Sequence, residues 1–248
     1  MGETVLITSG KGGAGKSTFA VNCGAALARM GRRVLIVDAD AGLRAIDLML
    51  SVQDSVIYDL SDVLAGRCEP VKAILSTGVE GLFVLPAPLD PADGSFEPEG
   101  MRRLCRGLTN YYEFVLIDSA AGMGPEVMTA AAGAGRAVII ATPDPVGVRD
   151  AGRIAAALEA AGLTKLRLVL NRVRPRLIRH RAAAALDRAI DDTAVQLLGV
   201  IPEDEAVVLA TFEGHPVLLE EKSRKNAAGA FGNIARRLVG EEVPLMKL

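Results

Sequence analysis

Short apolar runs recur along the chain, and longer stretches with helical periodicity separate them. The runs are continuous rather than alternating, which indicates strands buried on both faces, as in a parallel sheet with helices above and below. Seven strands are predicted, over Val5–Ile7, Val34–Val37, Leu82–Leu85, Phe114–Ile117, Val138–Ile140, Leu166–Leu170 and Leu197–Ile201. Helices are predicted over Phe19–Met30, Val56–Ala65, Glu99–Leu108, Gly124–Gly133, Gly147–Ala161, His180–Ile190 and Ser223–Val239.

The order of these elements predicts one α/β domain. No linker rich in Ser or Pro divides the 248 residues into halves, and no internal repeat is visible. The one irregular stretch, Pro86–Pro98, is predicted to be a surface loop near the carboxyl end of a strand, the edge where open sheets bind ligands. We expect a single three-layer α/β/α domain over residues 1–248, with a mostly parallel central sheet.

The segment between the first strand and the first helix carries a phosphate-binding pattern. It reads SGKGGAGKST and places Gly10, Gly15, Lys16 and Ser17 at the fixed positions of G-x-x-x-x-G-K-[ST]. Consecutive backbone N–H groups and the positive end of a helix would face one phosphate chain there, so the domain is expected to be a P-loop NTPase. The predicted phosphate-binding residues are Gly10, Lys11, Gly12, Gly13, Ala14, Gly15, Lys16, Ser17 and Thr18.

A second lysine, Lys11, stands at a position that the general pattern leaves free. If Lys16 already neutralises the bound nucleotide, Lys11 must face either solvent or a second phosphate chain. The residues themselves leave both possibilities open.

Acidic residues follow two of the predicted strands. Asp38 and Asp40 come after the second strand, and Asp118 after the fourth. A carboxylate at the end of a buried strand is costly unless it is paired, and a hydrated Mg²⁺ ion is a good partner. We predict a magnesium site formed by Ser17, Asp38 and Asp118; helix caps or surface charges are the alternative for the aspartates.

The loop K-G-G-x-G-K-[ST] resembles the deviant Walker A loop of the MinD/ParA family of ATPases, and Lys11 falls on the family's signature lysine. The resemblance runs from about Thr4 to about Pro244. The segments similar to the MinD branch are Asp38–Asp47 (first switch), Asp118–Gly122 (Walker B and second switch), Val148–Asp150 and Gly199–Asp204. Ala45 and Ala120 depart from the usual Asn and Pro of the two switches.

The resemblance implies that the chain binds ATP and Mg²⁺ and hydrolyses ATP to ADP and phosphate. It implies a homodimer when ATP is bound, in which Lys11 reaches the partner's nucleotide. Catalytic roles then fall to Lys11, Lys16 and Asp40, with Asp40 orienting the attacking water. Asn171 resembles the family's adenine-contacting residue, and the implied base pocket consists of Asn171, Arg172, Pro202, Glu203 and Asp204.

The MinD branch further implies division-site selection, with a cell-division inhibitor and an ATPase-activating protein as partners. A DNA-partition ATPase of the ParA type and a MinD-like regulator of flagellar number are the alternatives. Paired cysteines expected of a related iron–sulfur carrier are missing, because Cys23, Cys68 and Cys105 form no C-x-x-C pair.

Charge and hydropathy limit the other partners. The net charge is −2, with 28 basic and 30 acidic residues, so the chain as a whole does not attract nucleic acid or anionic lipid. One dense basic run is present, with Arg172, Arg174, Arg176, Arg179, His180 and Arg181. It lacks interleaved aromatic residues and is interpreted as a solvated face rather than a DNA surface, although a ParA-type function would require it.

Neither a leader peptide nor a membrane-spanning run is visible, and the cysteine usage fits a reducing compartment. We expect a cytoplasmic protein, with the inner face of the cell membrane as a second location. The last segment, Glu241–Leu248, is short and contains Pro244, so it is not expected to form the basic amphipathic helix with which MinD relatives bind lipid. Contact with the membrane therefore stays open.

Overall fold

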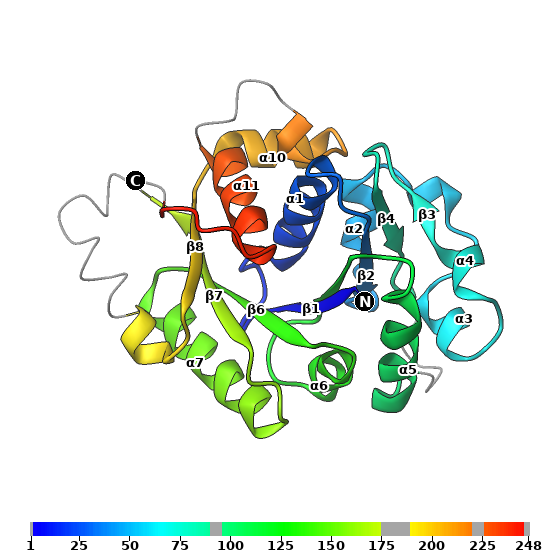
Figure 1. Cartoon of the computed structure of the whole chain (residues 1–248), viewed down its shortest axis with the longest axis horizontal. Coiled ribbons are helices and arrows are strands. Elements are labelled where there is room, and N and C mark those ends of the chain that lie inside the picture. The colour runs from blue at the N-terminus through cyan, green and yellow to red at the C-terminus, as the bar shows by residue number, and fades with distance from the viewer. Residues whose placement is uncertain (1, 90–95, 175–188, 220–225, 246–248) are drawn as a thin grey trace.

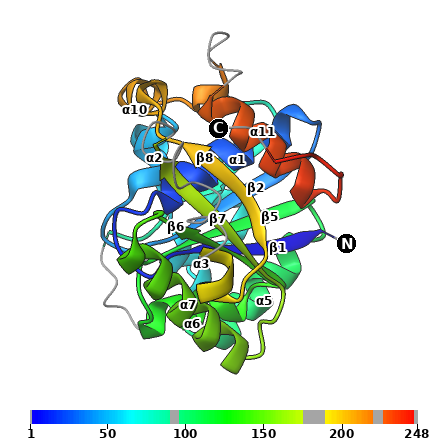
Figure 2. The ribbon, with the colours of Figure 1, turned by 90° about the vertical axis from the view of Figure 1, so that its left-hand side faces the viewer.

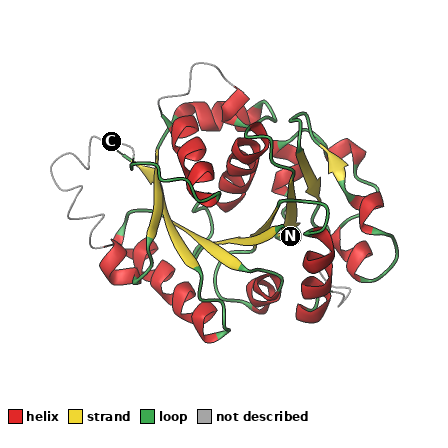
Figure 3. Ribbon diagram, in the orientation of Figure 1, coloured by secondary structure: helices red, strands yellow, loops and turns green. Residues whose placement is uncertain are grey.

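The computed structural model describes residues 2–89, 96–174, 189–219 and 226–245. An eight-stranded sheet forms the middle layer, and helices cover both of its faces (Figures 1 and 3). The strand order is β3-β4-β2-β5-β1-β6-β7-β8, and every neighbouring pair is parallel except β3 and β4. The predicted α/β class with a mostly parallel central sheet is confirmed.

All seven predicted strands are present, and six of them extend one to three residues beyond the apolar run. The strands are β1 Glu3–Thr8, β2 Val34–Ala39, β3 Leu75–Ser76, β4 Leu82–Leu85, β5 Phe114–Ser119, β6 Arg136–Ala141, β7 Leu166–Val173 and β8 Leu197–Pro202. The antiparallel edge strand β3 was not predicted, because two residues are too few to show a hydrophobic period.

The helices follow the predictions less closely. They are α1 Lys16–Arg29, α2 Ala45–Met49, α3 Leu60–Leu64, α4 Pro70–Ala73, α5 Pro98–Leu108, α6 Pro125–Ala132, α7 Pro145–Ala160, α10 Glu205–Phe212 and α11 Ala227–Leu238, with single 3₁₀ turns at η1 Gln53–Ser55 and η2 Val217–Leu219. Helices α2, α4 and α10 were not predicted. Of the predicted helix His180–Ile190, residues 180–188 lie outside the described part of the chain, and 189–193 are helical.

The predicted helix Val56–Ala65 is wrong in its first half. Only α3 is helical there, because Asp59 caps it: the Asp59 side chain accepts hydrogen bonds from the backbone of Ser61 and Asp62, and the Asp62 carboxylate accepts one from the Asp59 N–H. Such a capping box starts a helix at a defined residue and leaves the preceding chain extended.

Two apolar layers hold the sheet in place. On one face α1 and α11 lie side by side, and on the other α5, α6 and α7 cover the sheet (Figures 1 and 2). In the first layer the rings of Phe19 in α1 and Phe231 in α11 lie with centroids 6.2 Å apart. Helix α1, which begins at the phosphate loop, therefore packs against both the sheet and α11.

Strand register determines which residues meet at the carboxyl edge of the sheet. Ile7, just before the phosphate loop, pairs with Asp118, and Asp38 pairs with the same residue from the other side. The loop after β1 and the two carboxylates thus converge, although more than a hundred residues separate the first from the last.

One glycine allows α11 to pack closely on β8. A Cβ atom at Gly199 would lie 2.4 Å from Cγ1 and 2.8 Å from Cδ1 of Ile234, which is fully buried in α11. We expect Gly199→Ala to lower the free energy of unfolding by about 1–3 kcal/mol through overpacking, measured by urea denaturation.

Ile234→Ala alone should cost about 2–5 kcal/mol, and the double variant should cost less than the two single changes together, because the cavity accepts the new methyl group. Gly107→Ala in α5 is the matched control, since its Cβ would meet nothing within 4 Å. Additive costs in the double variant would contradict the close contact.

Candidate functional site

The phosphate loop leaves β1 at Ser9 and enters α1 at Lys16. Gly13 and Gly15 take φ values of 75° and 96°, a left-handed conformation that glycine adopts without strain. Gly15 is the residue before α1, so the first N–H groups of that helix point to the loop's concave side. Lys16 is the first residue of α1, and only 6% of it is exposed.

Two loop glycines are required by packing before any ligand binds. A Cβ at Gly10 would lie 2.5 Å from Cβ of Asp150 in α7, and one at Gly15 would lie 2.3 Å from Nδ2 of Asn171 at the end of β7. The same Asn171 amide donates a hydrogen bond of 2.8 Å to the carbonyl of Ala14. The loop is therefore held against two neighbouring elements.

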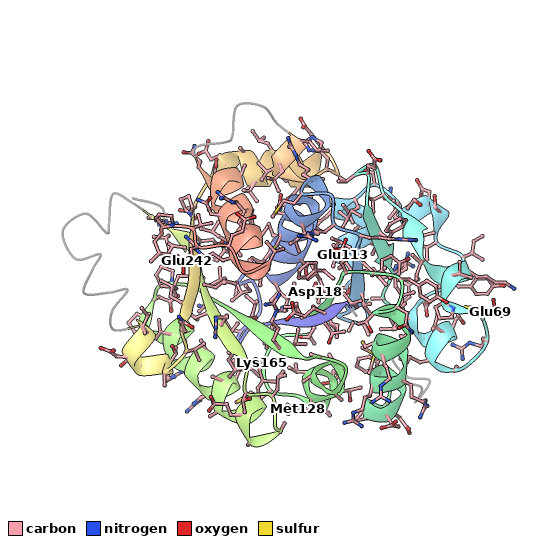
Figure 4. The ribbon with its side chains drawn as sticks, in the orientation of Figure 1. Glu69, Glu113, Asp118, Met128, Lys165 and Glu242 are labelled. Carbon is pink, nitrogen blue, oxygen red and sulfur yellow. The ribbon has the colours of Figure 1, made fainter. Side chains whose placement is uncertain are left out.

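Asp118 is fully buried, and within the described part of the chain neither of its carboxylate oxygens has a hydrogen-bond partner of good geometry. Figure 4 shows it in the interior of the molecule. Burial raises the pKa of Asp118 from 3.8 to about 7, against the opposing effects of the Ser17 hydroxyl and the Lys16 ammonium group. A buried carboxylate without a partner is costly, which points to a missing positive ligand.

Asp38 shares this environment. Burial and, second, the charge of Asp118 raise the pKa of Asp38 well above its ordinary value. Its Oδ1 accepts a hydrogen bond of 3.1 Å from the backbone N–H of Asp40. Asp40 is only partly buried, so it lies on the solvent side of the buried acidic pair Asp38 and Asp118. Burial raises the pKa of Asp40, and the charge of the nearby Lys16 opposes this rise.

The carboxylates and Ser17 offer the oxygen donors that Mg²⁺ prefers. No group of three or more His, Cys, Asp or Glu side chains in the described ranges could hold a metal ion without further ligands. The residues therefore fit a magnesium ion that takes its remaining ligands from nucleotide phosphates and water, and the unpartnered Asp118 is the observation that supports this fit.

Lys11 lies on the outer side of the loop. Its Nζ is 3.4 Å from Oδ2 of Asp144, and the two side chains are 39% and 45% exposed. Asp144 caps α7 by accepting from the N–H of Gly147 at 2.9 Å. The hydrogen bond from the Thr142 hydroxyl, ahead of the contributions of Gly147 and Lys11, lowers the pKa of Asp144 to about 2.

A cavity of about 470 Å³ opens beside the phosphate loop. All five residues of the implied base pocket line it, together with Gly15 and Thr18 of the loop: they are Asn171, Arg172, Pro202, Glu203 and Asp204. Glu203 also forms an ion pair with Arg174. The predicted base residues thus line one cavity together with the end of the phosphate loop.

Sequence reasoning missed the remaining wall of this cavity. It comes from α10, which contributes Val207, Val208, Thr211 and Phe212. The signal was present, because Asp204 before an apolar run is a typical helix start, and its side chain accepts from the N–H of Ala206 at 3.1 Å.

A second missed contact holds the end of the segment Asp38–Asp47. Asp47 is buried and pairs with Arg44 at 2.6 Å, while its other oxygen accepts from the N–H of Leu48 at 2.9 Å. Arg44 takes a left-handed φ of 42° at the start of α2. The end of the segment Asp38–Asp47 is therefore anchored, whereas its beginning lies in the acidic pair.

Part of the basic run falls outside the described residues, namely Arg176, Arg179, His180 and Arg181; Arg172 and Arg174 lie at the end of β7 and just after it. No helix in the described ranges has the length and hydropathy to cross a bilayer.

Comparison with known proteins decides the family. Residues 5–217 match the family model of the CobQ/CobB/MinD/ParA nucleotide binding domain. The chain belongs to the MinD/ParA family. Septum site-determining protein MinD of Synechocystis is 37% identical to it, across 99% of this chain and 92% of the relative, and MinD of Bacillus subtilis is 38% identical, across 100% and 93%.

Solved MinD structures have the same fold. The Aquifex aeolicus MinC:MinD cell division protein complex matches with a TM-score of 0.90 at 34% identity, covering 99% of both chains. MinD of Pyrococcus horikoshii, complexed with Mg-ADP, matches with a TM-score of 0.84 at 32% identity, covering 97% of both. A ParA family ATPase from Chlorobium tepidum is 21% identical, which shows the fold alone.

The unpartnered Asp118 predicts a pH-dependent stability. Because its folded pKa of about 7 is above its ordinary 3.8, its neutral form favours folding, and this contribution is lost as the pH rises from about 4 to about 7. In EDTA and without nucleotide, Asp118→Asn should therefore be more stable than the wild type at pH 8, by roughly 1–4 kcal/mol, and gain less at pH 4.

Urea denaturation at the two pH values measures this difference. Asp54→Asn is the control, because Asp54 is exposed in η1 and belongs neither to the phosphate loop nor to the strand ends that carry Asp38 and Asp118. An Asp118→Asn gain that is the same at pH 4 and pH 8 would contradict the assigned burial cost.

Proposed function

We propose that the protein is a MinD-like ATPase in division-site placement, which forms a homodimer around two ATP molecules and hydrolyses them slowly. The observation that carries the proposal is the different placement of the two lysines of one loop. Lys16 is buried among the loop amides, whereas Lys11 lies on the rim with its side chain 39% exposed. The Lys16 ammonium group contacts the phosphates bound in its own subunit, and the Lys11 ammonium group can reach a phosphate chain bound to another subunit.

Nucleotide binding follows from the loop and the cavity. Lys16 and the amides of Gly12 to Ser17 hold the β- and γ-phosphates, and Thr18 lies at the boundary with the base cavity. Asn171 links the two parts, since it supports Ala14 and lines the cavity. A loop held open in this way loses little conformational entropy when the nucleotide binds.

Ser17, Asp38 and Asp118 are the residues that would hold the magnesium ion. When bound, the ion supplies positive charge to the oxygens of the β- and γ-phosphates. Asp118 must be ionised to take part, and its burial, which raises its pKa, opposes this ionisation. Ser17 and Lys16, which already oppose the rise in this pKa, favour the ionised form that the ion requires.

Hydrolysis requires a water molecule in line with the bond between the γ-phosphorus and the bridging oxygen. Asp40 is the carboxylate closest to the solvent side of the acidic pair, and we assign it the role of accepting a hydrogen bond from that water. The water oxygen bonds to the γ-phosphorus while the bond between that phosphorus and the bridging oxygen breaks. A proton of the water passes to the released phosphate, and ADP and phosphate leave.

The Lys11 side chain can give up its contact with Asp144 at little cost in free energy. An ion pair that is about 40% exposed on both sides contributes at most about 1 kcal/mol. A triphosphate of a second subunit carries several negative charges and would displace the single carboxylate of Asp144. ATP, with its γ-phosphate, would therefore support dimerisation better than ADP.

The relatives suggest the biological setting. Several similar proteins are septum site-determining proteins MinD, and one similar solved structure is a MinC:MinD cell division protein complex. We propose that the ATP-bound dimer of this protein positions a cell-division inhibitor and that a second partner stimulates its ATPase activity. The proposed place of action is the cytoplasm, with the inner face of the cell membrane as a second location.

The two lysines should separate binding from dimerisation. Lys16→Ala should abolish nucleotide binding in isothermal titration calorimetry. Lys11→Ala should retain ADP binding within about threefold, because its contact is with another subunit, but should remain monomeric with ATP in light scattering. An ATP-dependent Lys11→Ala dimer of normal stability would contradict the cross-subunit role.

Asp40 should separate dimerisation from hydrolysis. Asp40→Asn keeps the size of the side chain and should leave ATP binding and dimerisation intact, while phosphate release falls by at least about 100-fold. The ATP-bound dimer should then persist longer than that of the wild type. If phosphate release falls less than about threefold, the water has another partner.

A further inference from the structure

Helix α10 exposes more apolar surface than a helix of eight residues normally does. Its large side chains Val208, Leu209 and Phe212 are all at least half exposed, Phe212 to 85%, and only Ala210 is buried. Exposed apolar side chains that gather on one short element are typical of a ligand or partner site.

Phe212 and Val208 belong to the face of α10 that lines the base cavity. The lining residues Val207, Val208, Thr211 and Phe212 are spaced i, i+1, i+4 and i+5, which is one side of a helix. Leu209 is equally apolar and 59% exposed, but it does not line the cavity. The helix therefore offers an aromatic residue to the cavity and, beside it, an unrelated apolar residue for comparison.

The opposite side of the cavity is suited to the edge of a base rather than to its face. The Asn171 side chain donates one hydrogen bond of 2.8 Å to the Ala14 carbonyl and accepts one of 2.9 Å from the N–H of Arg172. One N–H and one lone pair remain for a ligand. Phe231, the second aromatic lining residue, is buried against Phe19 and has its surface already covered.

Both ends of α10 are fixed, so Phe212 stands on a rigid support. At the start, the Asp204 carboxylate accepts from the N–H groups of Ala206 and Ala227, each at 3.1 Å. Beyond the end, the carbonyl of Gly214 accepts from the Ser51 hydroxyl at 3.0 Å, and the N–H of Val217 donates to the buried Asn22 at 2.8 Å. Binding against such a surface orders few further groups.

We infer that the Phe212 ring stacks on the purine base of the bound nucleotide, with Val208 extending the apolar contact. This inference rests on the proposed function, because it requires that a nucleotide occupies the site. An aromatic face contacts every base in the same way, so Phe212 raises the affinity for adenine and guanine nucleotides alike. Selection between them falls to the remaining polar atoms of Asn171.

The test compares Phe212→Ala with Leu209→Ala in calorimetric titrations with Mg²⁺, using ADP, GDP and inorganic triphosphate as separate ligands. Loss of a base–aromatic stack weakens binding by about 5- to 150-fold. Phe212→Ala should show this loss for ADP and for GDP by the same factor, and none for inorganic triphosphate. Leu209→Ala should bind all three ligands as the wild type does.

A fluorescence measurement gives an independent readout, since the chain contains no Trp. Phe212→Trp should change its emission when ADP is added and not when inorganic triphosphate is added, whereas Leu209→Trp should respond to neither. Wild-type affinity of Phe212→Ala for ADP, or an equal loss for ADP and inorganic triphosphate, would overturn the stacking role while the proposed function stands. If the wild type binds no ADP, both fall together.

Discussion

The register of three parallel strands is the constraint on which the site depends. Asp118 in β5 lies between Ile7 of β1 and Asp38 of β2, so a carboxylate with no hydrogen-bond partner of good geometry in the described part of the chain is buried at the sheet edge that carries the phosphate loop. Only charges that arrive from outside, or the protonation of Asp118, relieve this arrangement. The stability of the empty protein and its affinity for a metal–nucleotide complex are therefore linked through one residue.

The fold could be predicted to a large extent from the sequence, because the buried strands are short, continuous apolar runs separated by longer stretches with helical periodicity. The prediction failed for short helices and strands. Helix α3 begins at Asp59 through a capping box that overrides the apolar residues before it, and β3 has too few residues for any periodicity. Tertiary contacts decide such elements, and the linear pattern does not contain them.

The candidate site likewise has a part that the sequence predicts and a part that only tertiary packing brings into place. Residues in the phosphate loop are adjacent in sequence, so their spacing alone placed them, and Asn171 followed from the resemblance to the family. The wall formed by α10 could not be placed, since it reaches the loop only through the pairing of β7 with β8 and the packing of α11. The tie between Asn171 and Ala14 likewise joins residues 157 positions apart.

The central claim is that the two lysines of one loop serve two different nucleotides. It is tested most directly by a crystal structure with a slowly hydrolysed ATP analogue and Mg²⁺. The account predicts a dimer in which Lys11 Nζ has left Asp144 and lies within about 3 Å of a phosphate oxygen bound to the partner. A nucleotide-filled subunit in which Lys11 still contacts its own Asp144, with no second subunit at the phosphate edge, would contradict it.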